Sequence, residues 1–223
     1  MPNYRPPTAL TGTPGKATLP SGTTLYRVHS ARRDAAAFNP RPAHCLYGGG
    51  RFDGTPCDPY AYLYAGLSAA AAVCEALLRS LPFDPEGGPR LLPRASVVGR
   101  RLSVLRLTAD LDVVSLLTGR DLAAVHQDGW LVHTEAHDYA YTRDWAHWIR
   151  GHTGPWARGL LWSAKREPGE HAVVLFGDRC PPGAVSSVEE AAVDFGTAEG
   201  REWLDALVEP YAIRLAPEEG TAL

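Results

Sequence analysis

The order of hydrophobic and polar residues predicts a mixed fold of short strands and a few helices. Clusters of β-branched and aromatic residues that are typical of strands occur at residues 24–28, 62–66, 159–163, 171–177 and 210–214. Residues 96–117 alternate over a longer stretch, which predicts two strands or one bent strand. Because strands and helices do not alternate regularly, the pattern favours an α+β fold over a doubly wound parallel sheet.

One predicted helix has clear boundaries. The segment SAAAAVCEALLRSL, residues 68–81, begins at Ser68, whose hydroxyl suits the cap of the first turn, and is followed by Pro82. Its first half is almost entirely apolar, so the carboxylate of Glu75 is out of place on a helix that the pattern otherwise buries.

Further helices are expected in the second half of the chain. In TRDWAHWIRGH, residues 142–152, Thr142 suits the cap, and Trp145, Trp148 and Ile149 form an apolar stripe. Shorter helices are predicted at residues 119–127 and around 200–208.

Proline and glycine divide the chain. Residues 1–23 are rich in Pro, Gly and Thr and are predicted to form a flexible arm. Residues 39–60 are irregular, and residues 83–94 are predicted to form a surface loop. The expected organisation is one domain at residues 24–216 followed by a tail at 217–223.

Composition and charge exclude several classes of protein. The 223 residues carry a formal net charge of −3, which argues against general binding of nucleic acid. No apolar run is long enough to span a membrane, and the N-terminus lacks the apolar region of a secretory signal. The four cysteines include no Cys-x-x-Cys pair, so we expect reduced thiols and a cytoplasmic protein.

Four polar residues occupy positions where a solvated face is not the obvious interpretation. Arg27 lies inside the first strand, Arg51 follows three glycines, Glu75 lies in the apolar helix and Ser163 ends the strand GLLWS. Two arginines can grip a pyrophosphate, and the glycines let backbone approach it closely. A carboxylate can stabilise a ribosyl cation, a serine can orient the ligand, and the nearby ring of Tyr64 can pack on a ribose.

The glycine-rich segment does not have the pattern of a redox NAD site. Gly48, Gly49 and Gly50 are followed by RFDG, which is loop composition, whereas a dinucleotide fold requires Gly-x-Gly-x-x-Gly leading into a helix.

The order of these motifs resembles the RES domain family, which is named for its Arg, Glu and Ser. The resemblance rests on LYR, GGRFDGTP, LYAGLSAAAAVCEAL and GLLWS, and it covers about residues 24–180. It implies that Arg27 or Arg51 is the family's arginine, that Glu75 is its glutamate and that Ser163 is its serine.

The resemblance also implies a fold and an activity. The fold would be an ADP-ribosyltransferase-like split β-sheet with flanking helices. The activity would be cleavage of the nicotinamide–ribose bond of NAD by phosphate or water, with Glu75, Arg51 and Ser163 catalytic and Arg27, Arg51, Tyr64 and Ser163 binding NAD. NAD would be the substrate, with no cofactor and no metal. Members are commonly toxins held inactive by an Xre-like antitoxin protein.

Other interpretations stay open from sequence alone. Arg79 lies four residues after Glu75, the spacing of a solvated helix salt bridge. His133 and His137 have the spacing of a metal pair, although Thr134 replaces the glutamate of His-Glu-x-x-His. The chain could instead transfer ADP-ribose to a protein, bind NAD without catalysis, or interact through its Trp-rich surface.

Overall fold

A computed structural model of the chain describes residues 3–217, and its main feature is a sheet of eight strands. The strand order is β1-β6-β7-β8-β3-β2-β5-β9, in which only β6 and β7 are parallel. The strands are β1 (Lys16–Leu19), β2 (Thr24–Ser30), β3 (Tyr62–Gly66), β5 (Arg100–Leu107), β6 (Leu111–Leu116), β7 (Gly159–Ala164), β8 (Glu167–Phe176) and β9 (Val185–Asp194).

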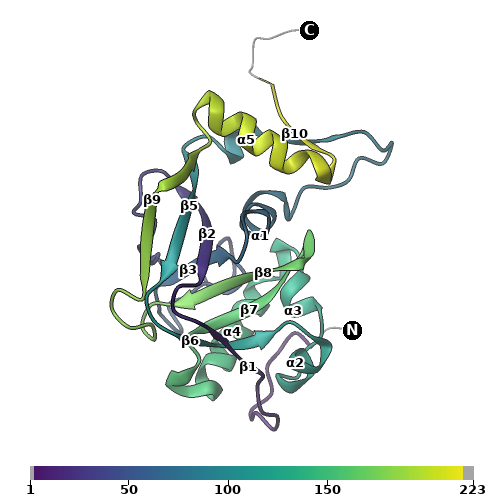
Figure 1. Cartoon of the computed structure of the whole chain (residues 1–223). Coiled ribbons are helices and arrows are strands. Elements are labelled where there is room, and N and C mark those ends of the chain that lie inside the picture. Colours follow the sequence, from purple (N-terminus) through teal and green to yellow (C-terminus); the bar gives the residue numbers. More distant parts are fainter. Residues whose placement is uncertain (1–2, 218–223) are drawn as a thin grey trace.

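The sheet is split between β2 and β3. These neighbours share one residue pair, Tyr26 opposite Gly66, whereas β2 and β5 pair over seven residues. Strands β2, β5 and β9 form one half and β1, β6, β7, β8 and β3 the other, and the two halves run in clearly different directions (Figure 1). The prediction of an α+β fold with a split sheet and flanking helices is confirmed.

Helices and a small second sheet surround this core. The helices are α1 (Ala69–Val73), a π-helical turn (Cys74–Leu78), α2 (Gly119–Ala124), α3 (Trp130–His133), α4 (Tyr139–Thr153) and α5 (Ala198–Val208). Short 3₁₀ segments are Arg94–Ser96, Ala136–Asp138, Gly154–Trp156 and Glu209–Tyr211. Strands β4 (Arg90–Leu92) and β10 (Ile213–Leu215) pair in parallel beside α5.

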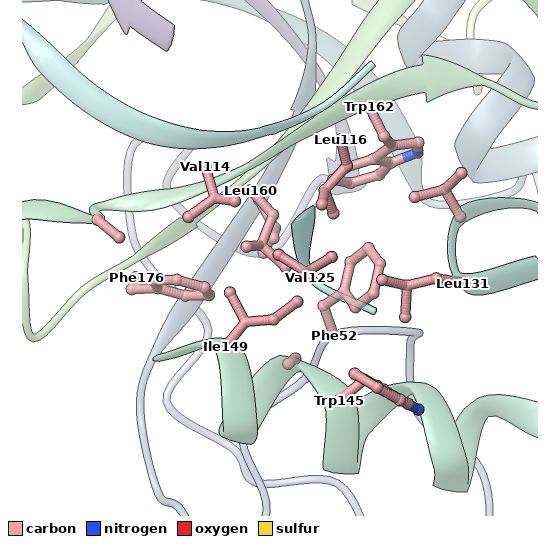
Figure 2. Close-up of a cluster of buried hydrophobic side chains, with 14 of the residues drawn as sticks. Phe52, Val114, Leu116, Val125, Leu131, Trp145, Ile149, Leu160, Trp162 and Phe176 are labelled. Atoms are coloured by element: carbon pink, nitrogen blue, oxygen red, sulfur yellow. The ribbon is translucent and has the colours of Figure 1, made fainter. Parts of the chain in front are cut away.

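Helix α4 packs its apolar face under the larger half-sheet. Trp145 and Ile149 are buried there with Phe52 and Trp162, as Figure 2 shows, so the predicted apolar stripe is confirmed. The predicted start of this helix is wrong, because α4 begins at Tyr139 and Thr142 lies inside its first turn.

The helix predicted over residues 68–81 begins as expected and then changes form. The Ser68 hydroxyl accepts the N–H of Ala71 at 3.1 Å. After Val73 the helix widens into the π turn Cys74–Leu78, and π turns inside helices occur frequently at functional sites. This turn carries Glu75.

Three segments differ from the sequence-based prediction. Lys16–Leu19, assigned to a flexible arm, is the edge strand β1 of the main sheet, because its backbone pairs with β6. Arg90–Leu92 is a strand inside the predicted surface loop, and Val185–Asp194 is a strand that the sequence pattern did not reveal. Of the predicted tail, residues 218–223 lie outside the described residues. No helix within the described part of the chain is both long and apolar enough to cross a membrane.

Candidate active site

A cavity of about 400 Å³ lies where the two half-sheets diverge. Tyr26 and Val28 line it from β2, and Tyr64 and Ala65 line it from β3. The π turn supplies Glu75 and Ala76. Other residues that line the cavity come from the glycine loop, from α1, from the strands and from the start of α4. They include Arg51, Arg79, Ser80, Arg100, Tyr139 and Trp162.

The glycine loop, residues 48–53, has a shape that its own sequence and α4 together determine. Gly48 and Gly49 adopt positive φ angles of 59° and 74°, which side chains other than glycine disfavour. Arg143 of α4 is fully buried and donates to the carbonyls of Gly48 at 2.8 Å and Gly50 at 3.2 Å. Helix α4 therefore holds the glycine loop through the loop's backbone carbonyls, a contact that no sequence motif reveals.

A second set of hydrogen bonds fixes the end of the glycine loop against β3. The Tyr64 hydroxyl donates to Asp53 at 2.9 Å and accepts the N–H of Phe52 at 2.8 Å. Asp53 also accepts the N–H of Gly50 and the hydroxyl of Tyr62. Burial, and then the charge of Asp53, raise the pKa of Tyr64, so its phenol stays neutral and serves to position the loop.

The Glu75 carboxylate is the centre of the polar network. Its Oε2 accepts Arg51 Nη2 at 3.0 Å and Arg79 Nη1 at 2.9 Å, and its Oε1 accepts the backbone N–H of Lys165 at 2.7 Å. The side chain of Glu75 is 13% exposed and those of both arginines are buried. The salt bridge to Arg79 that the spacing allowed does form, but it lies in the cavity wall and not on a solvated face.

Arg51 is positioned with hydrogen-bonding capacity left over. Its guanidinium lies 5.3 Å from the Phe52 ring centre and 5.4 Å from that of Trp162. Its carbonyl accepts the Thr142 hydroxyl at 2.8 Å. Within residues 3–217, its buried Nε and Nη1 have no hydrogen-bond partner. A buried donor without a partner is costly, so these two groups are candidates to bind a ligand.

Arg27 is the predicted site residue that the structure does not bring into the cavity. Tyr26 and Val28 line the cavity, and side chains of a strand alternate between faces, so Arg27 points to the opposite face of β2. Its Nη1 donates to the carbonyls of Ala35 at 2.6 Å and Ala37 at 2.7 Å. Burial lowers the pKa of Arg27 to about 10. These contacts give Arg27 a structural role in holding the following loop.

Ser163 lies beside the cavity and contacts the network through its backbone. Its neighbour Trp162 lines the cavity, whereas Ser163 is not among the lining residues. His133 Nε2 lies 3.3 Å from the Ser163 carbonyl, which accepts its proton in the matching tautomer. Burial lowers the pKa of His133, so the ring favours its neutral form. Two residues after Ser163, Lys165 presents the N–H that Glu75 accepts.

The histidine pair of the sequence analysis is divided between two short elements. His133 ends α3, and His137 lies in the next 3₁₀ turn with its side chain 75% exposed. Among residues 3–217, no three His, Cys, Asp or Glu side chains form a group that could hold a metal ion.

Sequence reasoning missed Arg79, Tyr139 and Arg143 as parts of the site. The spacing leaves Arg79 open as the partner in a solvated helix salt bridge, but its Nη2 donates to the Thr134 carbonyl and its guanidinium lies 5.6 Å from the Tyr139 ring centre. Burial raises the pKa of Tyr139. The i,i+4 spacing with Glu75 was a usable signal for Arg79, whereas Arg143 has no local signal because it contacts a loop about 95 residues away.

Comparisons with known proteins agree with this fold. The family model described as RES domain matches residues 24–198. Among solved structures, a chain of the M. tuberculosis MbcT–MbcA toxin–antitoxin complex superimposes with a TM-score of 0.55. The two chains are 20% identical, and the match covers 83% of this chain and 90% of that one. A sequence search of curated proteins gives no significant match.

Proposed function

This chain belongs to the RES domain family, and on that premise we propose that it cleaves the bond between nicotinamide and ribose in NAD. NAD is then the substrate and not a redox cofactor. The observation that carries the proposal is the Glu75 carboxylate, held by three donors in the cavity wall beside the incompletely paired Arg51. An anion next to donors without partners suits a ligand that carries a pyrophosphate and develops a cation.

The main partner of the pyrophosphate would be Arg51. Nε and Nη1 of Arg51 are buried without partners in the part of the chain that the structure describes, and a planar guanidinium can hold two phosphate oxygens at once. The sequence predicts Arg27 as the second arginine of this clamp, but the cavity instead contains Arg79, whose buried Nε also has no partner among the described residues. Arg51 and Arg79 therefore replace Arg51 and Arg27 as the proposed pair.

Glu75 would act on the ribose. Oε1 accepts one N–H, from Lys165, which leaves capacity for a ribose hydroxyl. As the bond between the anomeric carbon and nicotinamide breaks, its electron pair goes to the nicotinamide nitrogen and the ribose becomes a cation. The fixed carboxylate stabilises that cation, and water or inorganic phosphate then adds to the anomeric carbon and loses a proton to solvent.

Tyr64 and Ser163 would support this step in different ways. Tyr64 lines the cavity with its ring, which suits packing against the nicotinamide ribose, while its hydroxyl fixes the glycine loop. Ser163 lies beside the turn that donates to Glu75, and we retain it as the group that orients the nicotinamide side. No step in this scheme needs a metal ion.

The biological role that fits is that of a toxin. One structural relative is part of a toxin–antitoxin complex, and depletion of NAD would stop growth without any further target. We therefore propose that the free protein lowers cellular NAD and that an Xre-like antitoxin protein restrains it.

The test is release of nicotinamide from NAD by the purified protein, measured with and without inorganic phosphate. We expect release of nicotinamide in at least one of these conditions. The second product is ADP-ribose when water is the acceptor and its phosphorylated form when phosphate is the acceptor. Label from adenine-labelled NAD on a protein would redirect the proposal to ADP-ribosyl transfer. Binding of NAD without release of nicotinamide would indicate a nucleotide-binding module. A protein that neither binds NAD nor releases nicotinamide would overturn the proposal.

A further inference from the structure

Two cysteine side chains meet at the base of the segment that carries the glycine loop. Cys45 Sγ and Cys57 Sγ are 3.7 Å apart, although the residues are 12 positions apart in the chain. Both are free thiols; Cys57 is exposed and Cys45 is partly exposed. A disulfide needs its sulfurs at about 2.05 Å, so closure by roughly 1.6 Å, within the range of side-chain rotation, would join them.

The same ends of the segment are already joined by backbone contacts. The N–H of Ala43 donates to the Gly54 carbonyl at 2.8 Å and joins the two ends, while the N–H of Cys57 donates to the Thr55 hydroxyl at 3.2 Å within the second end. Arg143 Nη2 also donates to the Cys45 carbonyl at 3.3 Å. The thiols are therefore held near each other by the fold and do not meet by chance at the tips of two mobile side chains.

From this placement we propose that Cys45 and Cys57 form a reversible intramolecular disulfide when the protein meets a peroxide. One thiol loses its proton, the thiolate attacks a peroxide oxygen and the O–O bond breaks, which gives a sulfenic acid and a hydroxide that takes up the released proton as water. The second sulfur then attacks the sulfenic sulfur, the S–S bond forms, the S–O bond breaks, and a second water leaves with the thiol proton. The two cysteines are oxidised, and the peroxide is reduced to two waters.

The position of this modification site gives it a structural consequence. The bond would close a loop that contains Gly48, Gly49 and Arg51, the segment that forms one wall of the cavity. The outer part of that loop is open to solvent, with Leu46 and Tyr47 exposed by 64% and 72%. A disulfide would restrict its opening and stabilise the folded state. This inference does not depend on the proposed reaction with NAD.

The pH dependence follows from the contact itself. The hydrogen bond with Cys45, and then the charge of Cys45, raise the pKa of Cys57. Only thiolates attack peroxide, so oxidation should be faster above neutral pH than below it.

The experiment treats the full chain with hydrogen peroxide and follows intact mass, linked peptides and thermal melting. We expect a loss of about 2 Da that dithiothreitol reverses, with one linked peptide pair containing Cys45 and Cys57. Closing this loop should raise Tm by roughly 5–10 °C. Cys45→Ser and Cys57→Ser should each abolish the mass loss and the Tm change, whereas Cys180→Ser, outside the segment, should retain both.

Several results would overturn the assignment. These are gain of oxygen without cross-linking, a disulfide that involves Cys74 or Cys180, or a covalent dimer in place of the intramolecular bond. None of these readouts requires NAD, so failure of the disulfide and failure of the proposed reaction can be told apart.

Discussion

Arg27 and Arg51 lie on opposite faces of the sheet region around β2 and are almost equally buried, with exposed fractions of 6% and 4%. On the outer face, Arg27 donates to two loop carbonyls and lies beside the apolar cluster that contains Leu25. On the cavity face, Arg51 has one carboxylate partner among residues 3–217, and its buried Nε and Nη1 have no partner within that range. The comparison teaches that burial alone does not distinguish these two arginines, which differ in the face they occupy and in the two buried nitrogens of Arg51 that have no partner within residues 3–217.

The strongest way to break this comparison is to remove the charge on which the cavity face depends. Glu75→Gln keeps the size of the side chain but loses the negative charge that would stabilise the ribosyl cation of the proposed reaction. NAD turnover should fall by about 10²–10³, or roughly 2.7–4 kcal/mol, as for loss of one preorganised electrostatic contact. NAD affinity should change much less, because that cation exists only in the transition state.

Controls separate chemistry from folding in this experiment. Glu199→Gln, an exposed change in α5, should leave turnover unchanged. The change also removes the carboxylate that pairs with two buried arginines, so the folded state could lose stability. Melting curves measure whether Glu75→Gln is folded. A folded Glu75→Gln protein with parental turnover would remove Glu75 from the mechanism.

The next test exchanges each arginine for lysine. Arg51→Lys loses the planar donor pair, and NAD binding should weaken by about 1.5–3 kcal/mol, the range for a charge-assisted hydrogen bond. Arg27→Lys should leave NAD affinity unchanged and instead lower Tm by roughly 2–8 °C through lost bonds to Ala35 and Ala37. Calorimetric titration with NAD and thermal melts measure both effects. Equal loss of affinity in the two variants would contradict the assignment of Arg27 to the outer face.

Arg79 provides a third, smaller test. As a surface residue its removal would be silent, but it donates to Glu75 within the cavity wall. Arg79→Ala should lower kcat about 10-fold, because Glu75 would keep only two of its three donors, and Arg79→Lys should restore part of the loss. Arg32→Ala, in the exposed turn after β2, is the matched control. Unchanged kinetics in Arg79→Ala would return Arg79 to a purely structural role.

The smallest expected effect is a loss of folding stability in acid that comes from His29, on the same face of β2 as Arg27. His29 of β2 is buried, its Nε2 lies 2.9 Å from the Ser103 hydroxyl, and burial followed by the charge of Arg27 lowers its pKa to about 4. Unfolded His29 would take up a proton near pH 6.5, while the folded form stays neutral until about pH 4. Acid therefore favours unfolding, by about 1 kcal/mol between pH 6.5 and 5.5 from this residue.

His29→Gln tests that effect, since Gln keeps a hydrogen-bonding side chain that does not titrate. Denaturant melts at several pH values should show a shallower loss of stability in acid than for the parent. The same slope in both proteins would assign the acid sensitivity to other, partly buried histidines, of which His133 and His147 also have lowered pKa values.

The parts of the site that the sequence predicted are those that local patterns encode. Ser68 stands between the strand pattern and the apolar helix pattern, so the sequence shows it as the helix cap. Glu75 stands out as the one carboxylate in that helix. The glycines marked the loop that carries Arg51. Period-two alternation separates Arg27 from Tyr26 and Val28, but it does not say which face of β2 borders a cavity.

The parts that the sequence did not predict depend on contacts between distant segments. Arg143 and Thr142 reach the glycine loop from a helix about 90 residues later, so no local pattern connects them. Strand β1 was read as a flexible arm because an edge strand of four residues, next to prolines and glycines, has almost no periodicity of its own.

The single residue pair between Tyr26 and Gly66 makes the two half-sheets the arms of a V, with the cavity in its opening. Gly66 has no room for a side chain, since a Cβ there would lie 2.4 Å from the Ala72 nitrogen and 2.7 Å from the Ser68 carbonyl oxygen. One added methyl group would push against the first turn of α1, which leads into the π turn that carries Glu75. The shape of the cavity therefore depends on a position that carries no charge and no functional group.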